Sequence, residues 1–284
     1  MGRAAAIWPV RATGSAGQHR GVNRTATAQH LTHRDYHDVF ALNLTVTMSI
    51  DNNMATHVAQ LRERMDAACT RAGRPAGSVT LLPVSKTFGP DAIREAAALG
   101  FTRFGENKTQ EIRQKTGDLA DLNLQWVMIG HLQTNKAKDA ARDVAEVQSL
   151  DRLELAHALQ RRLATEGREI DVLVQIKTSP EPSKYGLPPE SAADFLRTLA
   201  RDCPALHVQG LMTMAVQSDD TQAVRACFRA LRELRDHLKT LAIDGVRLDR
   251  LSMGMSGDFE IAIEEGATEV RIGSAIFGAR QYPQ

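Results

Sequence analysis

The sequence predicts an α/β fold, a single (β/α)8 barrel of the TIM type. From about residue 54 onward, short apolar runs typical of strands alternate with helical patterns. There are eight strand candidates, and strands that alternate with helices pair in parallel because each crossover needs a covering helix. The chain has 284 residues, close to the size of one such barrel, about 250 residues. An open doubly wound sheet is the alternative, but no G-x-G-x-x-G sequence follows the first strand candidate, so we favour the barrel.

The predicted elements follow one another in a regular order. Asn53 can cap a helix that runs to about Ala72 and places Val58, Leu61, Met65 and Ala68 on one face. The apolar run 79–84 is the first strand, and a helical pattern at 92–99 ends at Gly100. Further strands are expected near 103–104, 124–129, 146–149, 170–176, 207–212, 247–252 and 269–272, with helices at about 106–116, 133–141, 151–166, 189–201, 219–239 and 258–265. No helix is expected after the last strand.

Composition narrows the class of protein. Hydrophobic residues make up 43% and charged residues 24% of the chain, which suits a globular protein with a sizeable core. The net charge of +1 gives no reason to expect a nucleic-acid or membrane-surface partner, and no run approaches the roughly 18 apolar residues of a membrane span. Three cysteines lie far apart without C-x-x-C spacing, so we expect no disulfide framework, no metal site and a reducing, cytoplasmic location.

Residues 1–47 differ from the barrel, to which we assign 48–284. Between Met1 and Arg34 there is no Asp or Glu, while five arginines are spread among small and polar residues. No periodic apolar face appears, so this extension is expected to be disordered. An organelle transit peptide, a flexible tail and an over-extended start are the candidate origins. We favour the last, with the true initiator at Met48 or Met54.

Lys86 is the first candidate site residue, because it directly follows the first predicted strand. In a parallel barrel, chemistry gathers at the carboxyl ends of the strands. A lysine that is partly removed from water there has a lowered pKa and can form an imine with an aldehyde. A solvated loop lysine is the alternative, and position alone does not decide between the two.

Two glycine-rich segments, after strand candidates seven and eight, form a candidate phosphate site. The segment 252–258 contains two glycines and two serines before a predicted helix, where backbone N–H groups and hydroxyls can hold an anion. In the segment 270–278, Gly273 permits a close backbone approach and Ser274 can donate to a phosphate. Each segment alone could be an ordinary turn, but the loops after strands seven and eight are the frequent phosphate site of this fold.

A set of motifs in a fixed order carries a family resemblance. They are Val84–Thr87, Phe104–Asn107, Gln125–Lys136, Asp151–Leu153, Lys184–Gly186, Gly210–Met212, Ser252–Ser256 and Val270–Gly278. Over about residues 54–280 the chain resembles the pyridoxal phosphate homeostasis proteins, the YggS/PROSC family, which are related in fold to the N-terminal barrel domain of alanine racemase. The resemblance implies that barrel type and pyridoxal 5'-phosphate (PLP) as the cofactor. Lys108 departs from the family, which usually has an aromatic residue there.

The resemblance also implies which residues bind the cofactor: Lys86, Asn107, Met255, Ser256, Arg271, Gly273 and Ser274. Lys86 would carry the Schiff base, and Arg271 would face the pyridine nitrogen. The two serines and Gly273, with the backbone of Met255, would hold the phosphate. Asn107 would be a polar neighbour of the cofactor. We expect neither catalytic residues nor metal ligands.

We expect a PLP carrier rather than an enzyme. Arginine only donates hydrogen bonds, so Arg271 favours an unprotonated pyridine nitrogen and a poorer electron sink, although racemases of this fold share that arginine. A two-base racemase needs acid/base groups on both faces of its substrate. Alanine racemase takes the second from a domain after the barrel, and only six residues follow Gly278 here. The expected function is PLP buffering or delivery, with transient contact to PLP-dependent apo-enzymes, and thereby amino-acid and keto-acid balance.

Two other functions stand as alternatives. One is a minimal barrel-type amino-acid racemase, and the other is a barrel that binds a phosphate metabolite without aldehyde chemistry, where Lys86 only pairs with a charge. His131 and Gln133, after the third strand candidate, could touch a substrate or only close a loop.

Overall fold

The computed structural model describes residues 54–181 and 185–278 of the chain. The extension 1–47 lies outside the described residues, as does Lys184. Within them, eight strands follow the predicted order: β1 (Thr80–Pro83), β2 (Arg103–Glu106), β3 (Gln125–Met128), β4 (Glu146–Leu150), β5 (Ile170–Gln175), β6 (Leu206–Met212), β7 (Arg250–Ser252) and β8 (Glu269–Ile272). Every pairing among these strands is parallel, as expected.

In the described residues one helix precedes β1, and an α-helix follows each of the eight strands. They are α2 (Met54–Arg71), α3 (Pro90–Ala98), α4 (Thr109–Asp118), α5 (Ala137–Asp143), α6 (Leu153–Glu166), α7 (Ala192–Asp202), α8 (Thr221–Thr240), α9 (Phe259–Glu264) and α10 (Ser274–Phe277). Single 3-10 turns lie at η1 (Ala120–Leu122), η2 (Thr134–Lys136) and η3 (Pro189–Ser191). The expectation that no helix follows the last strand is wrong, because α10 begins directly after Gly273. A four-residue helix has no apolar periodicity that a sequence pattern could reveal.

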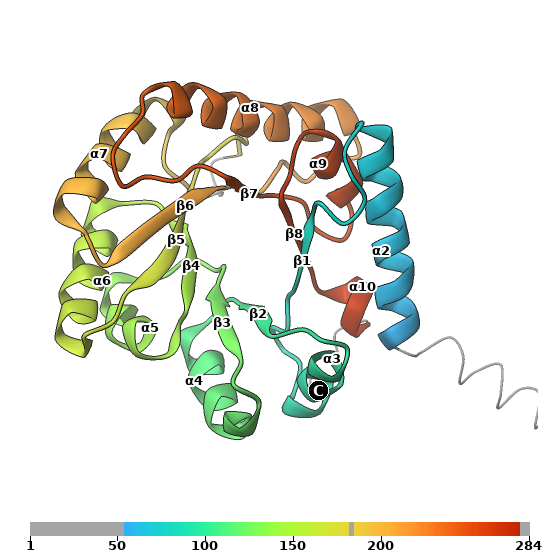
Figure 1. Ribbon diagram of the computed structural model, residues 1–284, viewed down its shortest axis with the longest axis horizontal. Helices are drawn as coiled ribbons and strands as arrows, with labels where there is room; N and C mark the ends of the chain where they lie inside the picture. The colour runs from blue at the N-terminus through green and yellow to red at the C-terminus, as the bar shows by residue number, and fades with distance from the viewer. Residues whose placement is uncertain (1–53, 182–184, 279–284) are drawn as a thin grey trace, which may run out of the picture. The chain divides into compact units, whose positions relative to one another are not determined.

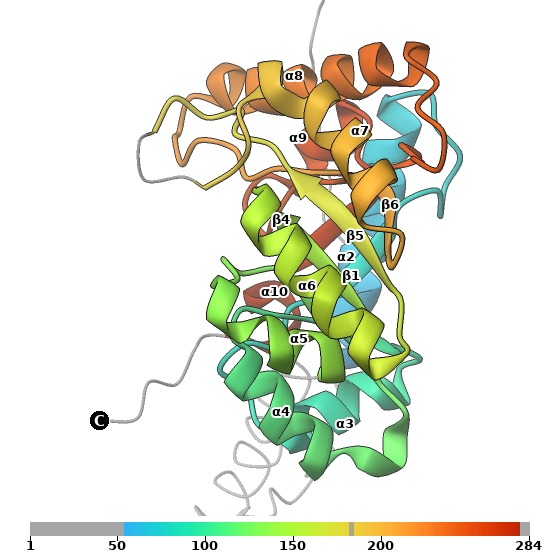
Figure 2. The ribbon, with the colours of Figure 1, turned by 90° about the vertical axis from the view of Figure 1, so that its left-hand side faces the viewer.

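The strands close into a near-complete barrel. Along the sheet their order is β1-β8-β7-β6-β5-β4-β3-β2, and a parallel bridge between Val84 and Gly105 joins the carboxyl ends of β1 and β2. Figure 1 shows the helices outside this ring of strands, and Figure 2 shows α4, α5, α6 and α7 in succession on one side of it. The predicted (β/α)8 fold is therefore confirmed.

Local chemistry explains several helix ends. Asp220 caps α8, since its carboxylate accepts from the N–H groups of Gln222 and Ala223. Gly167 ends α6 at a φ of +61°, and Gly100 follows α3 at +93°, a left-handed backbone that glycine adopts without strain. The predicted helix at 106–116 begins only at Thr109, because Glu106 continues β2 in register with β3.

The apolar core lies between the strands and the helices. On α2, the four predicted face residues Val58, Leu61, Met65 and Ala68 are all buried, together with Met54 and Cys69. Full burial of each large apolar side chain contributes about 1.5–3 kcal/mol, so this face fastens α2 to the barrel. The inside of the barrel differs, because polar side chains from several strands fill part of it.

Candidate functional site

One cavity at the carboxyl ends of the strands collects all seven predicted cofactor-binding residues. It measures about 450 Å³, within the range of small-molecule sites. Its lining consists of Val84, Lys86, Asn107, Ile129, Gly130, His131, Gln175, Tyr185, Met214, Met255, Ser256, Gly257, Arg271, Gly273 and Ser274. A second hollow of about 480 Å³ lies at the opposite, amino ends of β6 and β7 and takes its lining from 207–209 and 245–247 alone. Only the first gathers polar groups from many strands.

Lys86 stands on a tight turn at the end of β1. Phe88 N–H donates to Ser85 O at 3.0 Å, so Lys86 and Thr87 are the central residues of a β-turn. Val84, the residue before this turn, is buried and lines the 450 Å³ cavity, which fixes where the turn leaves the barrel. The ring of Phe88 stacks on Phe277 of α10 with 5.0 Å between centroids. The turn is thereby joined to the element that carries Ser274.

Arg271 reaches the cavity from inside the barrel. It is 4% exposed; its Nη1 donates to Ser252 Oγ at 2.9 Å and its Nη2 to Thr213 O at 2.8 Å. Burial lowers the pKa of Arg271 to about 10, opposed by the carboxylates of Glu269 and Asp258. The guanidinium therefore stays charged at neutral pH, as a donor held in one orientation.

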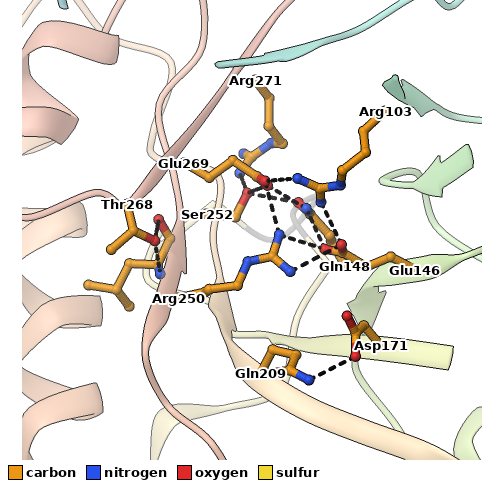
Figure 3. A network of polar contacts seen from close by, with 11 residues as sticks. Arg103, Glu146, Gln148, Asp171, Gln209, Arg250, Ser252, Thr268, Glu269 and Arg271 are labelled. Atoms are coloured by element: carbon orange, nitrogen blue, oxygen red, sulfur yellow. Dashed lines mark hydrogen bonds and ion pairs between the residues drawn. The ribbon is translucent and has the colours of Figure 1, made fainter. Parts of the chain in front are cut away.

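A buried polar network extends from Arg271 toward the amino ends of the strands (Figure 3). Its members, besides Arg271, are Ser252, Gln148, Glu146, Glu269, Arg103 and Arg250. Ser252 Oγ lies 2.7 Å from Gln148 Oε1 and 3.1 Å from Glu269 Oε1. Both glutamates accept from both outer arginines at 2.5 to 3.1 Å. Three guanidiniums thus face two carboxylates.

The ionisation of Glu269 follows from this arrangement. Its side chain is 2% exposed, and such burial by itself would raise the pKa of the carboxyl group. The charges of Arg250 and Arg103 outweigh burial and hold the pKa of Glu269 below its usual range. Glu269 is therefore an anion at neutral pH, and the barrel interior contains a network of full charges.

The two predicted serines meet at one end of the cavity. Ser274 Oγ lies 3.3 Å from Ser256 Oγ, although 18 residues separate them in sequence. A Cβ on Gly273 would lie 3.2 Å from Val84 O, closer than most side chains allow, so glycine suits this approach to β1. Met255 also lines the cavity, but its N–H donates to Asp258 Oδ1 at 2.6 Å and is engaged within its own loop.

His131, Tyr185, Gln175 and Met214 also line the cavity, and only His131 had been weighed as a contact residue. The rings of His131 and Tyr185 are stacked with 3.9 Å between centroids. Gln175 ends β5, and its Nε2 donates to Tyr185 O at 2.9 Å. Gln175 and Met214 stand at or just beyond strand ends, so the rule that selected Lys86 would also have selected them. Gln133 lines a neighbouring hollow instead.

Residues 54–181 and 185–278 contain neither a candidate metal-ion cluster nor a candidate membrane span. No group of three or more His, Cys, Asp or Glu side chains in these ranges is placed to hold a metal ion. No helix in them is long and apolar enough to cross a membrane.

Known proteins are similar to this chain in sequence and in fold. The family model for the alanine racemase N-terminal domain matches residues 56–281. A pyridoxal phosphate homeostasis protein of Aquifex aeolicus is 44% identical over 231 residues, which cover 81% of this chain and 100% of that protein. The structure of PipY of Synechococcus elongatus with PLP bound is 36% identical, with a TM-score of 0.67, and the match covers 76% of this chain and 99% of PipY.

A more distant structure shares the fold alone. Alanine racemase of Clostridium difficile is 13% identical, with a TM-score of 0.66 over 82% of this chain and 58% of the racemase. The chain belongs to the pyridoxal phosphate homeostasis protein family, with the barrel of the alanine racemase N-terminal domain.

Proposed function

We propose that this chain binds PLP in the 450 Å³ cavity and holds it as a Schiff base on Lys86. The convergence of all seven expected residues on one cavity is the observation that carries the proposal. Lys86 would hold the cofactor through an imine between its amine nitrogen and the aldehyde carbon, with one water released. The PLP-bound structure of PipY supports the same cofactor, because the match covers nearly the whole length of PipY.

The two ends of the cavity suit the two ends of the cofactor. The hydroxyls of Ser256 and Ser274 offer donors to a phosphate. Arg271 offers a permanent donor to the unprotonated pyridine nitrogen. Met255 borders the phosphate as a lining residue, and Asn107 is a polar neighbour of the ring.

We further propose that the protein stores and hands over the cofactor rather than catalysing a reaction with it. Bound PLP supplies an electron sink to enzymes when its ring nitrogen is protonated, and a charged arginine opposes that protonation. The partners would be PLP-dependent apo-enzymes, met transiently, and the outcome would be intracellular PLP homeostasis. The three cysteines are free and buried, which supports a reducing compartment such as the cytoplasm.

Absorbance spectroscopy tests the proposal. Purified protein incubated with PLP is expected to develop a visible imine band, and borohydride reduction followed by peptide mapping is expected to place the adduct on Lys86. Lys86→Ala should lose both signals. If no band forms, the binding of a phosphate metabolite without aldehyde chemistry replaces our proposal. If the loaded protein exchanges the α-hydrogen of an amino acid in D2O at an enzymatic rate, it is a minimal racemase and the carrier function is wrong.

A further inference from the structure

The turn that carries Lys86 has a strained backbone. Thr87, the residue after the lysine, has a φ of +71°. Glycine or asparagine usually occupies such a position, and a β-branched side chain is disfavoured there. A strained residue persists only where its surroundings hold it, so the contacts of this turn indicate what holds it.

Those contacts come from the end of β2 and from α4. Lys115 Nζ donates to Ser85 O at 3.0 Å, and Glu111 Oε2 accepts from Thr87 N–H at 3.0 Å. Ser85 Oγ donates to Glu106 Oε1 at 2.7 Å. The residues on both sides of Lys86 are therefore fixed. Lys115 Nζ also lies 2.6 Å from Glu106 Oε1 and 3.4 Å from Glu111 Oε2.

This cluster is poorly explained by stability alone. Lys115 and Glu106 have side chains 8% and 0% exposed, and a buried ion pair often contributes no more stability than apolar residues of the same volume. Glu106 Oε2 is buried without a hydrogen-bond partner within the described part of the chain. Burial accordingly raises the pKa of Glu106 against the opposing effects of Lys115 and Ser85. Such a costly arrangement, directly behind the reactive lysine, indicates a positional role.

We propose that Lys115 and Glu111 are positioning residues, which clamp the Ser85–Phe88 turn so that the Lys86 amine meets the aldehyde carbon. This inference rests on the Schiff base proposed above. A lysine side chain has four rotatable carbon–carbon bonds, so its nitrogen can be aimed only if its backbone is fixed. Small errors in the placement of reacting atoms slow a reaction strongly, by about 100-fold for 1 Å.

Lys115 itself does not qualify as the aldehyde-binding lysine. Its ammonium group is buried and donates to Ser85 O and to both glutamates, so it presents no free, accessible amine. It also lies outside the lining of the cavity. Its role is exerted through the turn.

The test separates imine formation from cofactor binding. Lys115→Met and Glu111→Ala remove the clamp, Glu111→Gln retains an oxygen that can accept from Thr87 N–H, and Arg113→Ala alters an exposed residue of the same helix as a control. Each variant is mixed with PLP, and the rate at which the visible imine band appears is measured. The affinity for 4'-deoxypyridoxine 5'-phosphate, which lacks the aldehyde, is measured by titration, and folding is checked by thermal melting.

We expect the imine to form about 10- to 100-fold more slowly in Lys115→Met and Glu111→Ala. The affinity for the aldehyde-free analogue should change less than twofold, and Glu111→Gln and Arg113→Ala should form the imine within twofold of the wild-type rate. If Lys115→Met does not fold, the two Glu111 variants decide, because Glu111 is a quarter exposed. Wild-type imine rates in Glu111→Ala, or a parallel loss of analogue affinity, overturn the clamp. A wild-type protein that gives no band refutes the proposed Schiff base instead.

Discussion

Glu269→Gln is the sharpest perturbation of the buried network, because it removes a charge and almost no volume. The Glu269 carboxylate accepts from Arg103 at 3.0 Å, Arg250 at 2.9 Å, Gln148 at 2.5 Å and Ser252 at 3.1 Å. In the wild-type network three guanidiniums lie near two carboxylates (Figure 3), so in the variant they face the single carboxylate of Glu146. The new amide NH2 group must also lie among hydrogen-bond donors, and it cannot accept a hydrogen bond from any of them.

The expected loss of unfolding free energy follows from these contacts. Removing one partner of a buried ion pair costs about 3–5 kcal/mol, and two charge-assisted hydrogen bonds to arginine at about 1.5–3 kcal/mol each give a similar sum. Urea denaturation at pH 7 measures this loss, and for a domain of this size the melting temperature should fall by roughly 10 °C. Glu260→Gln is the matched control. It breaks an ion pair with Arg64 whose side chains are 38% and 51% exposed, and it should cost less than about 1 kcal/mol.

The difference between wild type and Glu269→Gln should also depend on pH. The pKa of Glu269 is lowered in the folded protein, so its stabilising effect is fully present above the unfolded value of 4.5 and is lost as the pH falls through the folded pKa. The two proteins should therefore converge in stability below about pH 4.5. A loss under 1 kcal/mol at pH 7, or a gap that widens in acid, would refute the ionised network.

Three further outcomes are expected. Gly210→Ala should destabilise the fold by about 3 kcal/mol or more in thermal melting, because the new Cβ would meet Arg250 O across the β6–β7 ladder, and an unchanged melting temperature would contradict that packing. Cys203, which is buried and whose pKa is raised by burial to about 11, should react with a thiol reagent at pH 8 only on unfolding; rapid labelling of the native protein would show otherwise. Ser256→Ala and Ser274→Ala should each weaken PLP affinity about tenfold in fluorescence titrations while the imine band persists, and unchanged affinity would place the phosphate elsewhere.

The sequence predicted the barrel because its main signals are periodic. Apolar strand runs and the amphipathic face of α2 can be counted directly. The carboxyl-end rule then selected Lys86, the segment 252–258 and Ser274, and the family resemblance singled out Ser256 within that segment; Lys86, Ser256 and Ser274 do line one cavity. The clamp behind Lys86 was not predicted. Lys115 is buried on a helix whose sequence is mostly polar, and only its contacts to Ser85 O and Glu106 distinguish it from a surface lysine.

The polar network was missed for a different reason, although its pattern is present in the sequence. Glu146, Arg250 and Glu269 open their strands, and the next inward-facing position, two residues on, holds Gln148, Ser252 and Arg271 respectively. Side chains two apart on a strand share a face, so the two members of each pair point to the same side of the sheet, into the barrel. An apolar strand pattern does not reveal such pairs. The strands are recognised from the apolar residues between the pair members, Val147, Leu251 and Val270, which face outward to the helices.

The polar network connects the amino end of the barrel to the cavity. Charged residues at that end would ordinarily concern stability alone, since chemistry in this fold lies at the carboxyl ends. Here the two outer arginines, Arg103 and Arg250, balance the two glutamates in charge, and Ser252 joins Glu269 to Arg271. The unbalanced positive charge of the network is therefore the one that faces the cavity. In the proposed PLP complex, a donor placed in this way would favour an unprotonated ring nitrogen, because a guanidinium donates hydrogen bonds and accepts none.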